Sequence, residues 1–224
     1  MNDFGYRTKI YIVLLTLFCS CLILGNIIFK KFTSFSIFGI DFELSVGALT
    51  YPITFIFTDL ISEFYGKQKS DFAVKCGVIS SLFVALLLMI TNTLPSTSWS
   101  YISKDEYNKM FGLYEVVFGA SILSNYLAQK IDIRIYLFFK DLTKGKYIWL
   151  RNNASTIVSQ ITDSVVIYSL MLYLGTIPNG KFFTVFSSAI LFKIMFSLIC
   201  TPFYYMAIFA CKILLDQTKL KNHK

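Results

Sequence analysis

The chain has little charge. Asp, Glu, Lys and Arg make up only 15% of its 224 residues, against roughly a quarter in an average soluble domain. A soluble protein of this length needs many more polar and charged side chains to cover its surface. The shortage excludes an ordinary soluble enzyme and a disordered chain. Because 55% of the residues are hydrophobic, the composition indicates a membrane protein.

Residues that commonly carry catalysis or hold metals are also scarce. The one histidine, His223, lies in a basic tail outside every apolar run. The sequence has no His-Glu-x-x-His pattern, no Ser–His pair within a span and no glycine-rich phosphate loop. We therefore predict no enzyme activity, no metal, no cofactor and no ATPase within the chain. The five cysteines accompany apolar runs, which favours small buried residues over a disulfide or metal framework.

Phenylalanine and tyrosine are abundant, at 23 and 14 residues, as is typical of helices that face lipid and its interfaces. A membrane-spanning helix needs about 20 predominantly apolar residues. Six runs meet that description, namely 10–29, 44–64, 72–94, 110–129, 153–174 and 182–211. The sequence thus predicts an all-α integral membrane protein in which residues 1–224 form a single six-helix membrane domain.

The positive charges predict the orientation of these six helices. With a cytoplasmic N-terminus, fifteen Lys and Arg residues fall in cytoplasmic segments and five in external segments, while Lys193 lies within a span. Cytoplasmic loops of membrane proteins carry an excess of Lys and Arg. We therefore expect both termini in the cytoplasm. The net charge of +8 is explained by these loops, so we expect the lipid bilayer rather than nucleic acid as a partner.

Ionisable groups inside a membrane are costly, so the charged residues of the second, fifth and sixth predicted spans are functional candidates by default. Asp59 and Glu63 share one face of the second helix, with Glu63 near its cytoplasmic end. Asp163 and Lys193 lie near the middle of the fifth and sixth helices. Because a short connection makes these helices antiparallel neighbours, we predict that the two side chains face one another. Such a pair either only fixes helix packing or lines a solute site.

Neutral polar residues form stripes on the same helices. Ser121, Asn125 and Gln129 follow a four-residue spacing in the fourth helix, and Gln160 accompanies Asp163 in the fifth. A carboxylate with amide side chains can bind the donors and acceptors of a guanine-like edge, although the same groups also serve as contacts between helices or as a proton relay. The candidate solute-binding residues are Asn26, Asp59, Glu63, Asn125, Gln129, Gln160, Asp163 and Lys193.

Two strings carry a family resemblance. Residues 58–66 read Thr-Asp-Leu-Ile-Ser-Glu-Phe-Tyr-Gly, and residues 149–156 read Trp-Leu-Arg-Asn-Asn-Ala-Ser-Thr. Residues 128–132 and the pair 192–193 support them. Over nearly its whole length the chain resembles the queuosine precursor transporter family, also described as vitamin-uptake-transporter-like. The resemblance implies six helices in a bacterial inner membrane. It also implies uptake of a 7-deazaguanine, either a queuosine precursor or queuine, for tRNA modification.

The resemblance assigns motif positions residue by residue. It places Asp59, Glu63, Ser155, Gln160, Asp163 and Lys193 in the matching motifs, with Asn26 near a polar position of the first helix. One departure stands out, because the family pattern leads us to expect a basic residue in the first half of the fourth helix. This chain has Glu115, Val116 and Val117 there. Without that basic residue, the charge pairing expected in the fourth helix is in doubt, and so is the identity of the base that is carried.

Other interpretations remain open at this stage. The chain could be a solute-capture subunit that depends on a separate ATPase module, or it could carry another small polar or vitamin-like solute. A scaffold or a small channel would have a similar composition. Thr58-Asp59 and Thr162-Asp163 fit a 3+3 pseudo-repeat, but chance explains two matched pairs equally well. A small bundle rich in aromatic residues is also compatible with a homodimer.

Overall fold

The structure is a computed structural model of the full chain, and it describes residues 5–37, 39–111, 114–173, 175, 177 and 179–221. Side chains are described for the same residues except 114–118, 179 and 216–221. The side chains of residues 115–117, where the sequence departs from the family pattern, therefore lie outside the described ones. In chain order the elements are α1 (Tyr6–Ile28), β1 (Phe32–Ile37), β2 (Ile40–Ser45), η1 (Val46–Leu49), α2 (Tyr51–Thr93), α3 (Lys104–Phe111), α4 (Tyr114–Leu142), α5 (Ile148–Tyr173), η2 (Asn179–Lys181) and α6 (Phe182–Lys221).

Long apolar helices dominate the fold, as the composition predicts. Within the described residues, four helical segments are long and apolar enough to cross a membrane, namely Tyr6–Ile28, Val46–Thr93, Ile148–Tyr173 and Phe182–Leu215. The chain is thus a multi-pass helical membrane protein. The fourth predicted span corresponds to α4, which is not among these segments because its polar stripe and its charged residues Lys130 and Asp132 lower its hydropathy.

The segment 46–93 is too long for one crossing. Its 48 residues would extend roughly 70 Å as a straight helix, against about 30 Å of hydrocarbon. The helix bends at Gly66, whose φ of 75° and ψ of −178° are not helical, and only glycine adopts such angles readily. The predicted second and third helices are therefore joined by one glycine instead of the loop expected between residues 64 and 72.

The end of a β-hairpin and the short 3-10 helix η1 occupy the predicted start of the second span. We expected a helix from residue 44, but β1 and β2 form a two-stranded antiparallel sheet and α2 begins at Tyr51. Phe42 and Leu44 are buried, whereas Asp41 and Glu43 between them are not. This alternation of apolar and acidic residues is the pattern of a half-buried strand, and it overrides the apolar composition of the segment.

The other helices differ from the predicted spans mainly in length. The predicted spans 10–29 and 153–174 correspond to α1 and α5 within a few residues, whereas α4 and α6 continue to Leu142 and Lys221. The polar stretch before the fourth span contains α3, whose start is capped by reciprocal hydrogen bonds between Ser103 and Glu106. This is a capping box, which satisfies backbone donors at a helix start.

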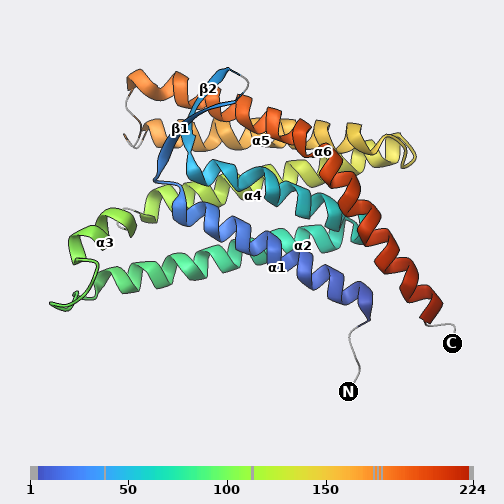
Figure 1. The fold of residues 1–224 in the computed structure, drawn as a ribbon, viewed down its shortest axis with the longest axis horizontal. Helices are drawn as coiled ribbons and strands as arrows, with labels where there is room; N and C mark the ends of the chain where they lie inside the picture. Colours follow the sequence, from blue (N-terminus) through green and yellow to red (C-terminus); the bar gives the residue numbers. More distant parts are fainter. Residues whose placement is uncertain are drawn as a thin grey trace.

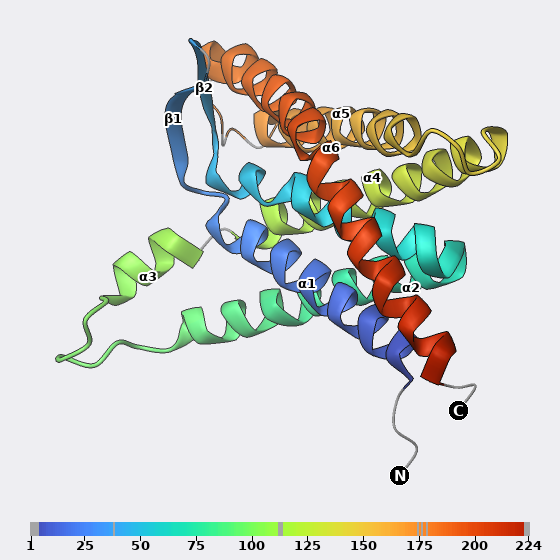
Figure 2. The ribbon, with the colours of Figure 1, turned by 45° about the vertical axis from the view of Figure 1, so that its right-hand side comes forward.

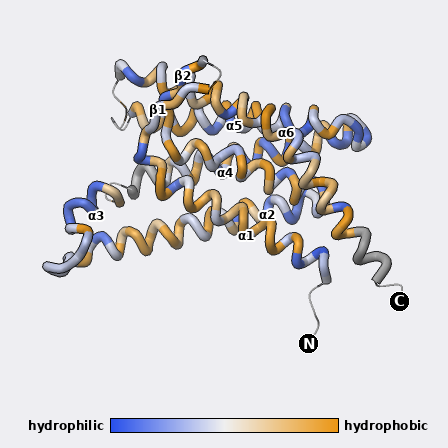
Figure 3. Tube along the Cα trace, viewed as in Figure 1, coloured by the Kyte–Doolittle hydropathy of each residue, from blue (hydrophilic) through white to orange (hydrophobic). Residues whose placement is uncertain are grey.

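The two ends of the bundle differ in content (Figures 1 and 2). The hairpin, α3 and η2 lie at one end, and the start of α1, the bend of α2, the α4–α5 connection and the end of α6 lie toward the other. Hydrophilic segments gather at these ends, while the helices between them are mostly hydrophobic (Figure 3). This banding is the arrangement expected of a bundle that crosses a bilayer.

Close helix packing positions the polar core. Gly25 of α1 and Gly47 of η1 approach so closely that a Cβ on Gly47 would collide with the carbonyl oxygen of Gly25. This contact fixes the start of α2 against α1. Helix α4 packs against both α2 and α5, and α5 packs against α6, with Asn153 of α5 bonded to Thr201 of α6. The polar residues of four helices therefore converge in the interior.

Candidate solute site

A buried ion pair joins α5 and α6. The Nζ atom of Lys193 lies 2.7 Å from Oδ2 of Asp163, and each side chain is 3% exposed. Ser124 of α4 donates to the other carboxylate oxygen, Oδ1, at 2.8 Å. Lys193 also donates to Ser164 at 2.9 Å, and its Nζ lies 5.3 Å from the ring centre of Tyr51. The predicted contact between Asp163 and Lys193 is thus confirmed.

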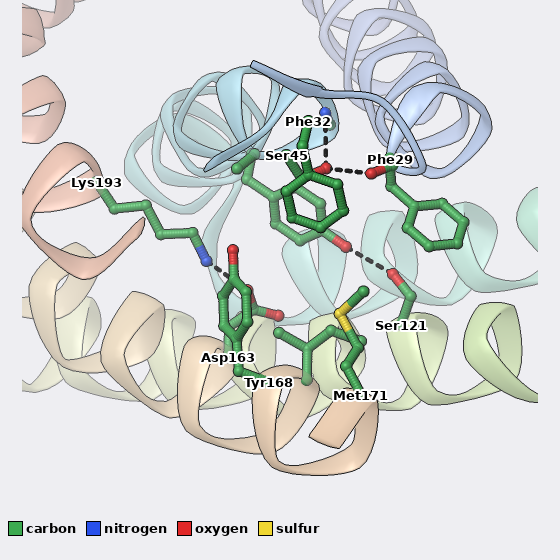
Figure 4. A pocket seen from close by; sticks show the side chains of 12 residues that line it. Phe29, Phe32, Ser45, Ser121, Asp163, Tyr168, Met171 and Lys193 are labelled. Atoms are coloured by element: carbon green, nitrogen blue, oxygen red, sulfur yellow. Dashed lines mark hydrogen bonds and ion pairs between the residues drawn. The ribbon is translucent and has the colours of Figure 1, made fainter. Parts of the chain in front are cut away.

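A small cavity borders this pair (Figure 4). Figure 4 shows Lys193 reaching toward Asp163, with Tyr168, Met171 and Ser121 around the same space. Its volume is about 40 Å³, which exceeds the room one water needs but falls far short of the several hundred Å³ typical of ligand pockets. The remaining wall comes from the end of α1 and from the segment between β1 and α2. The full lining is Phe29, Phe32, Ser45, Gly47, Ala48, Tyr51, Ser121, Asp163, Ile167, Tyr168, Met171 and Lys193.

A second polar group lies beside the cavity and connects α1, α2 and α4. Oδ1 of Asn26 accepts a hydrogen bond from Ser121 at 2.7 Å and a longer one from Tyr51 at 3.5 Å. The hydroxyls of Tyr51 and Ser121 are 2.8 Å apart. All three residues are buried. Asn26, predicted from its position in the first helix, is therefore linked to the cavity through two side chains that line it.

Deeper in the core, the predicted amide side chains divide into two groups. Gln129 is engaged, because Thr58 donates to its Oε1 at 2.8 Å and its Nε2 donates to Thr54 at 3.2 Å. Asn125 and Gln160 are 2% and 1% exposed, yet among the described residues Nδ2 of Asn125 and both polar atoms of Gln160 have no hydrogen-bond partner. A buried amide without partners is costly, so these two side chains have unused capacity to bind a polar group.

Two aspartates occupy the next layer. Asp59 of α2 and Asp132 of α4 are both fully buried. Ser159 of α5 donates to Oδ1 of Asp132 at 3.1 Å. In the described part of the chain, no donor reaches either carboxylate oxygen of Asp59. The predicted residue Asp59 is therefore placed beside a second carboxyl group and away from the cavity lining.

Glu63 closes the other end of the polar core. Its carboxylate lies 2.7 Å from Nη2 of Arg151 and 3.0 Å from Nζ of Lys140. Tyr136 donates to the same carboxylate at 3.1 Å and lies 2.6 Å from the hydroxyl of Tyr204. Arg151, which is 1% exposed, also donates to Tyr136 and to the carbonyl oxygen of Gly145. This inner network joins α2, α4, α5 and α6.

The structure thus brings the predicted residues into one buried column but in separate layers. Asp163 and Lys193 line the cavity, with Asn26 beside it, whereas Asp59 and Glu63 lie toward the inner end. Sequence reasoning missed the roles of Asp132 and Arg151. A signal existed for both, because Asp132 continues the polar stripe of the fourth helix and Arg151 lies four and eight residues before Ser155 and Ser159 on one helix face.

The arrangement is suited to binding a polar molecule. Its groups are carboxylates, a lysine, hydroxyls and amides. The described residues contain no cluster of three or more His, Cys, Asp or Glu side chains that could hold a metal ion. A carboxylate in such a setting accepts two hydrogen bonds in one plane, and neighbouring amides supply both donors and acceptors.

Comparison with known proteins identifies the family of the chain. Residues 45–207 match the family model described as "Putative vitamin uptake transporter". The chain is 31% identical over 172 residues to the "Probable queuosine precursor transporter" of Bacillus subtilis (strain 168), a match that covers 76% of this chain and 73% of the Bacillus protein. No solved structure matches the chain significantly. Both matches confirm the resemblance seen in the sequence, and the chain belongs to this family of membrane transporters, the queuosine precursor transporters of the vitamin-uptake type.

Proposed function

We propose that the protein carries a 7-deazaguanine, either a queuosine precursor or queuine, across a bacterial inner membrane for tRNA modification. The similarity to the Bacillus queuosine precursor transporter supports the class of solute. The observation that carries the assignment is the buried Asp163–Lys193 pair in the wall of the cavity, because a carboxylate is the group that best accepts the paired N–H donors of a guanine-like edge.

The base would bind by taking the place of Lys193 at the carboxylate. Asp163 keeps Ser124 on its second oxygen, so the carboxylate stays oriented during the exchange. Lys193 retains Ser164 and the ring face of Tyr51 as partners, and it is therefore not left as an isolated charge. This exchange couples solute binding to a rearrangement of α5 against α6.

The remaining faces of a bicyclic base also find partners nearby. Tyr168 and Phe29 line the cavity and offer aromatic surfaces for stacking. The amide of Gln160 lies one helical turn from Asp163 and has unused donors and acceptors among the described residues. The Nδ2 atom of Asn125 likewise has no hydrogen-bond partner among the described residues. These two amides would read the carbonyl and pyrrole edges.

The cavity must widen before a base can enter. At about 40 Å³ the space holds water-sized groups only. The residues nearest the hairpin end, Phe32 and Ser45, form part of its wall, so movement of the hairpin segment away from α5 would open it. We place the external entrance at this end of the bundle.

We propose six crossings with both termini in the cytoplasm. The bend at Gly66 divides the segment 46–93 into two crossings, and α4 provides the fourth. The five basic residues predicted to be external belong to the end with the hairpin, α3 and η2, whereas the described residues of the larger set lie toward the opposite end, as the positive-inside rule expects. A single six-helix domain, a 3+3 repeat and a homodimer stay predictions.

Uptake in cells tests the function. The chain would be expressed in a bacterium that lacks deazaguanine synthesis and its own importer, and that can insert free queuine. The cyano precursor, the aminomethyl precursor or queuine would be supplied at low concentration, and queuosine in tRNA would be measured by its retarded gel mobility. We expect rescue by at least one base, lost in Asp163→Asn and retained in Asp71→Asn, which alters a partly exposed pair with Lys130.

Two results would contradict the proposal. The first is failure of every base to restore queuosine although full-length protein is present in the membrane. The second is normal uptake by Asp163→Asn. Purified protein in liposomes that binds the base but never transports it would instead support a capture subunit that depends on a separate ATPase.

A further inference from the structure

Two hydrogen bonds between α2 and α4, one before and one after Asp59 along the chain, place Asp59 opposite Asp132. One residue before Asp59, Thr58 donates to Gln129, which precedes Asp132 by three positions. Four residues after Asp59, Glu63 accepts from Tyr136, which follows Asp132 by four. Because α2 and α4 run in register through both contacts, the two aspartates occupy facing positions in the turn between them. Their carboxyl groups lie within hydrogen-bonding reach of each other.

Asp59 has no donor among the described residues to hold it as an anion, whereas Asp132 accepts from serine hydroxyls of α5. Both side chains are fully buried. In the described structure the oxygens of Asp59 receive no hydrogen bond, and Oδ2 of Asp132 also lacks a donor. Two ionised carboxylates only accept hydrogen bonds, so they cannot bond to each other. A hydrogen bond between them requires one proton, which makes one group the donor.

The surrounding charges lead to the same conclusion. The third carboxylate, Glu63, is paired with Arg151 from α5 and Lys140 from α4. The hydroxyls of Tyr136 and Tyr204, from α4 and α6, are hydrogen-bonded to each other and face the same region. With both aspartates ionised, three carboxylates would face two cations in the protein interior, where an uncompensated charge is costly. One shared proton balances this layer.

We propose that Asp59 and Asp132 form a proton-binding site that couples uptake of the base to inward movement of a proton. This inference rests on the proposed transport function and assigns its energy source. The proton is held as the carboxylic acid of one aspartate, which donates to the carboxylate of the other. When the proton leaves toward the cytoplasmic end, both groups are carboxylates, and Arg151 lies close enough to stabilise the carboxylate of Asp59 electrostatically.

A proton fits this site better than a metal ion. Hard metal cations are usually held by six or more oxygen ligands. Beyond the two carboxyl groups, the oxygens that reach this layer are the serine hydroxyls of α5, with Ser159 bonded to Asp132. The described residues also hold no cluster of three or more metal-binding side chains. Asp59, a candidate for direct contact with the base on sequence grounds, is thereby reassigned to proton binding.

Infrared difference spectroscopy of the purified full-length protein tests the site without any solute. The carbonyl stretch of a protonated carboxylic acid appears apart from that of a carboxylate. We expect such a band in the wild type at neutral pH, and we expect Asp59→Asn and Asp132→Asn each to remove it. Asp71→Asn, which changes a partly exposed aspartate on the same helix as Asp59, should leave the band intact. Absence of the band in the wild type, or its survival in both core variants, would overturn the proposal.

Transport by proteoliposomes tests the coupling. Labelled 7-cyano-7-deazaguanine and queuine would be supplied in parallel, with an inward proton gradient or an inward sodium gradient. We expect the wild type to accumulate base with the proton gradient only. Asp59→Asn should still exchange labelled for unlabelled base across the membrane but lose gradient-driven accumulation. Accumulation by Asp59→Asn at the wild-type level, or accumulation driven by sodium alone, would contradict proton coupling.

The two readouts separate this inference from the transport function on which it rests. If the wild type moves neither base, the transport proposal fails, while the infrared band still decides whether the aspartate pair holds a proton. Asp59→Asn could lose exchange together with accumulation. The infrared band of the wild type then decides between proton binding and a structural role, because an aspartate that serves only packing would not give the carbonyl band of a protonated acid.

Discussion

The outer and inner halves of the polar core handle buried charge differently. In the outer half, Asp163 meets one cation, and a cavity lies beside the pair. In the inner half, Glu63 meets two cations and a tyrosine hydroxyl, and Arg151 is tied to α2, to α4 and to the α4–α5 connection. An ion pair with a single counter-charge for each group can be exchanged for a ligand, whereas a network of several ion pairs resists opening. The contrast supports the proposed solute site toward the hairpin end, and we infer from it a closed gate toward the opposite end.

The largest loss of stability should come from removing one charge of the Asp163–Lys193 pair. Lys193→Met leaves Asp163 as a buried carboxylate without its cation, and we expect a loss of about 3–5 kcal/mol in the free energy of unfolding. The double variant Asp163→Asn with Lys193→Met should recover most of that loss, because no charge remains unpaired, yet it should not transport. Denaturant unfolding in detergent micelles measures the first effect, and uptake measures the second. A double variant as unstable as Lys193→Met would argue against the pair.

The inner network should respond less to the loss of one member. Arg151→Met leaves Glu63 with Lys140 and Tyr136, so we expect destabilisation by about 2 kcal/mol, the range for hydrogen bonds to charged groups. Opening of the gate should also speed amide hydrogen exchange around residues 143–151, measured by mass spectrometry. Arg134→Met, which removes an exposed arginine of α4, provides the matched control. Unchanged exchange in Arg151→Met would show that the network does not hold this end closed.

The hydroxyl beside the cavity should affect solute affinity more than stability. Ser121→Ala removes a bond to Asn26 and the contact with Tyr51. We expect the KM for the base to rise about tenfold, which corresponds to about 1.4 kcal/mol, with a smaller change in kcat. Initial uptake rates across a concentration series measure both. Ser187→Ala removes an exposed hydroxyl that bonds to the backbone of its own helix, and an equal KM in the two variants would refute the assignment.

The smallest effect should come from the exposed pair on the hairpin. Lys181 lies 3.1 Å from Glu43, and the two side chains are 57% and 38% exposed. Such pairs contribute up to about 1 kcal/mol and are screened by salt. We expect Glu43→Gln to change the melting temperature little, and less at high salt than at low salt. A shift as large as that of Arg151→Met would mean that the hairpin contact is part of the closed state.

Sequence reasoning identified the outer half better than the inner half. The Asp163–Lys193 contact follows from depth along two neighbouring antiparallel helices, both readable from the apolar runs. The role of Arg151 is not readable in that way, because a basic residue beside a loop resembles an ordinary cytoplasmic charge until folding buries it against Glu63. The hairpin was not predicted, although the alternation of Phe42 and Leu44 with Asp41 and Glu43 indicates a strand.

The division between a solute site and an inner gate can be tested by binding alone. Equilibrium dialysis of the purified protein with labelled 7-cyano-7-deazaguanine and with queuine would compare the wild type, Asp163→Asn and Asp59→Asn. We predict that Asp59→Asn binds the base as the wild type does, whereas Asp163→Asn binds it at least about tenfold more weakly, a loss of about 1.4 kcal/mol. Wild-type affinity in Asp163→Asn, with binding lost in Asp59→Asn, would place the solute in the inner half and contradict the assignment.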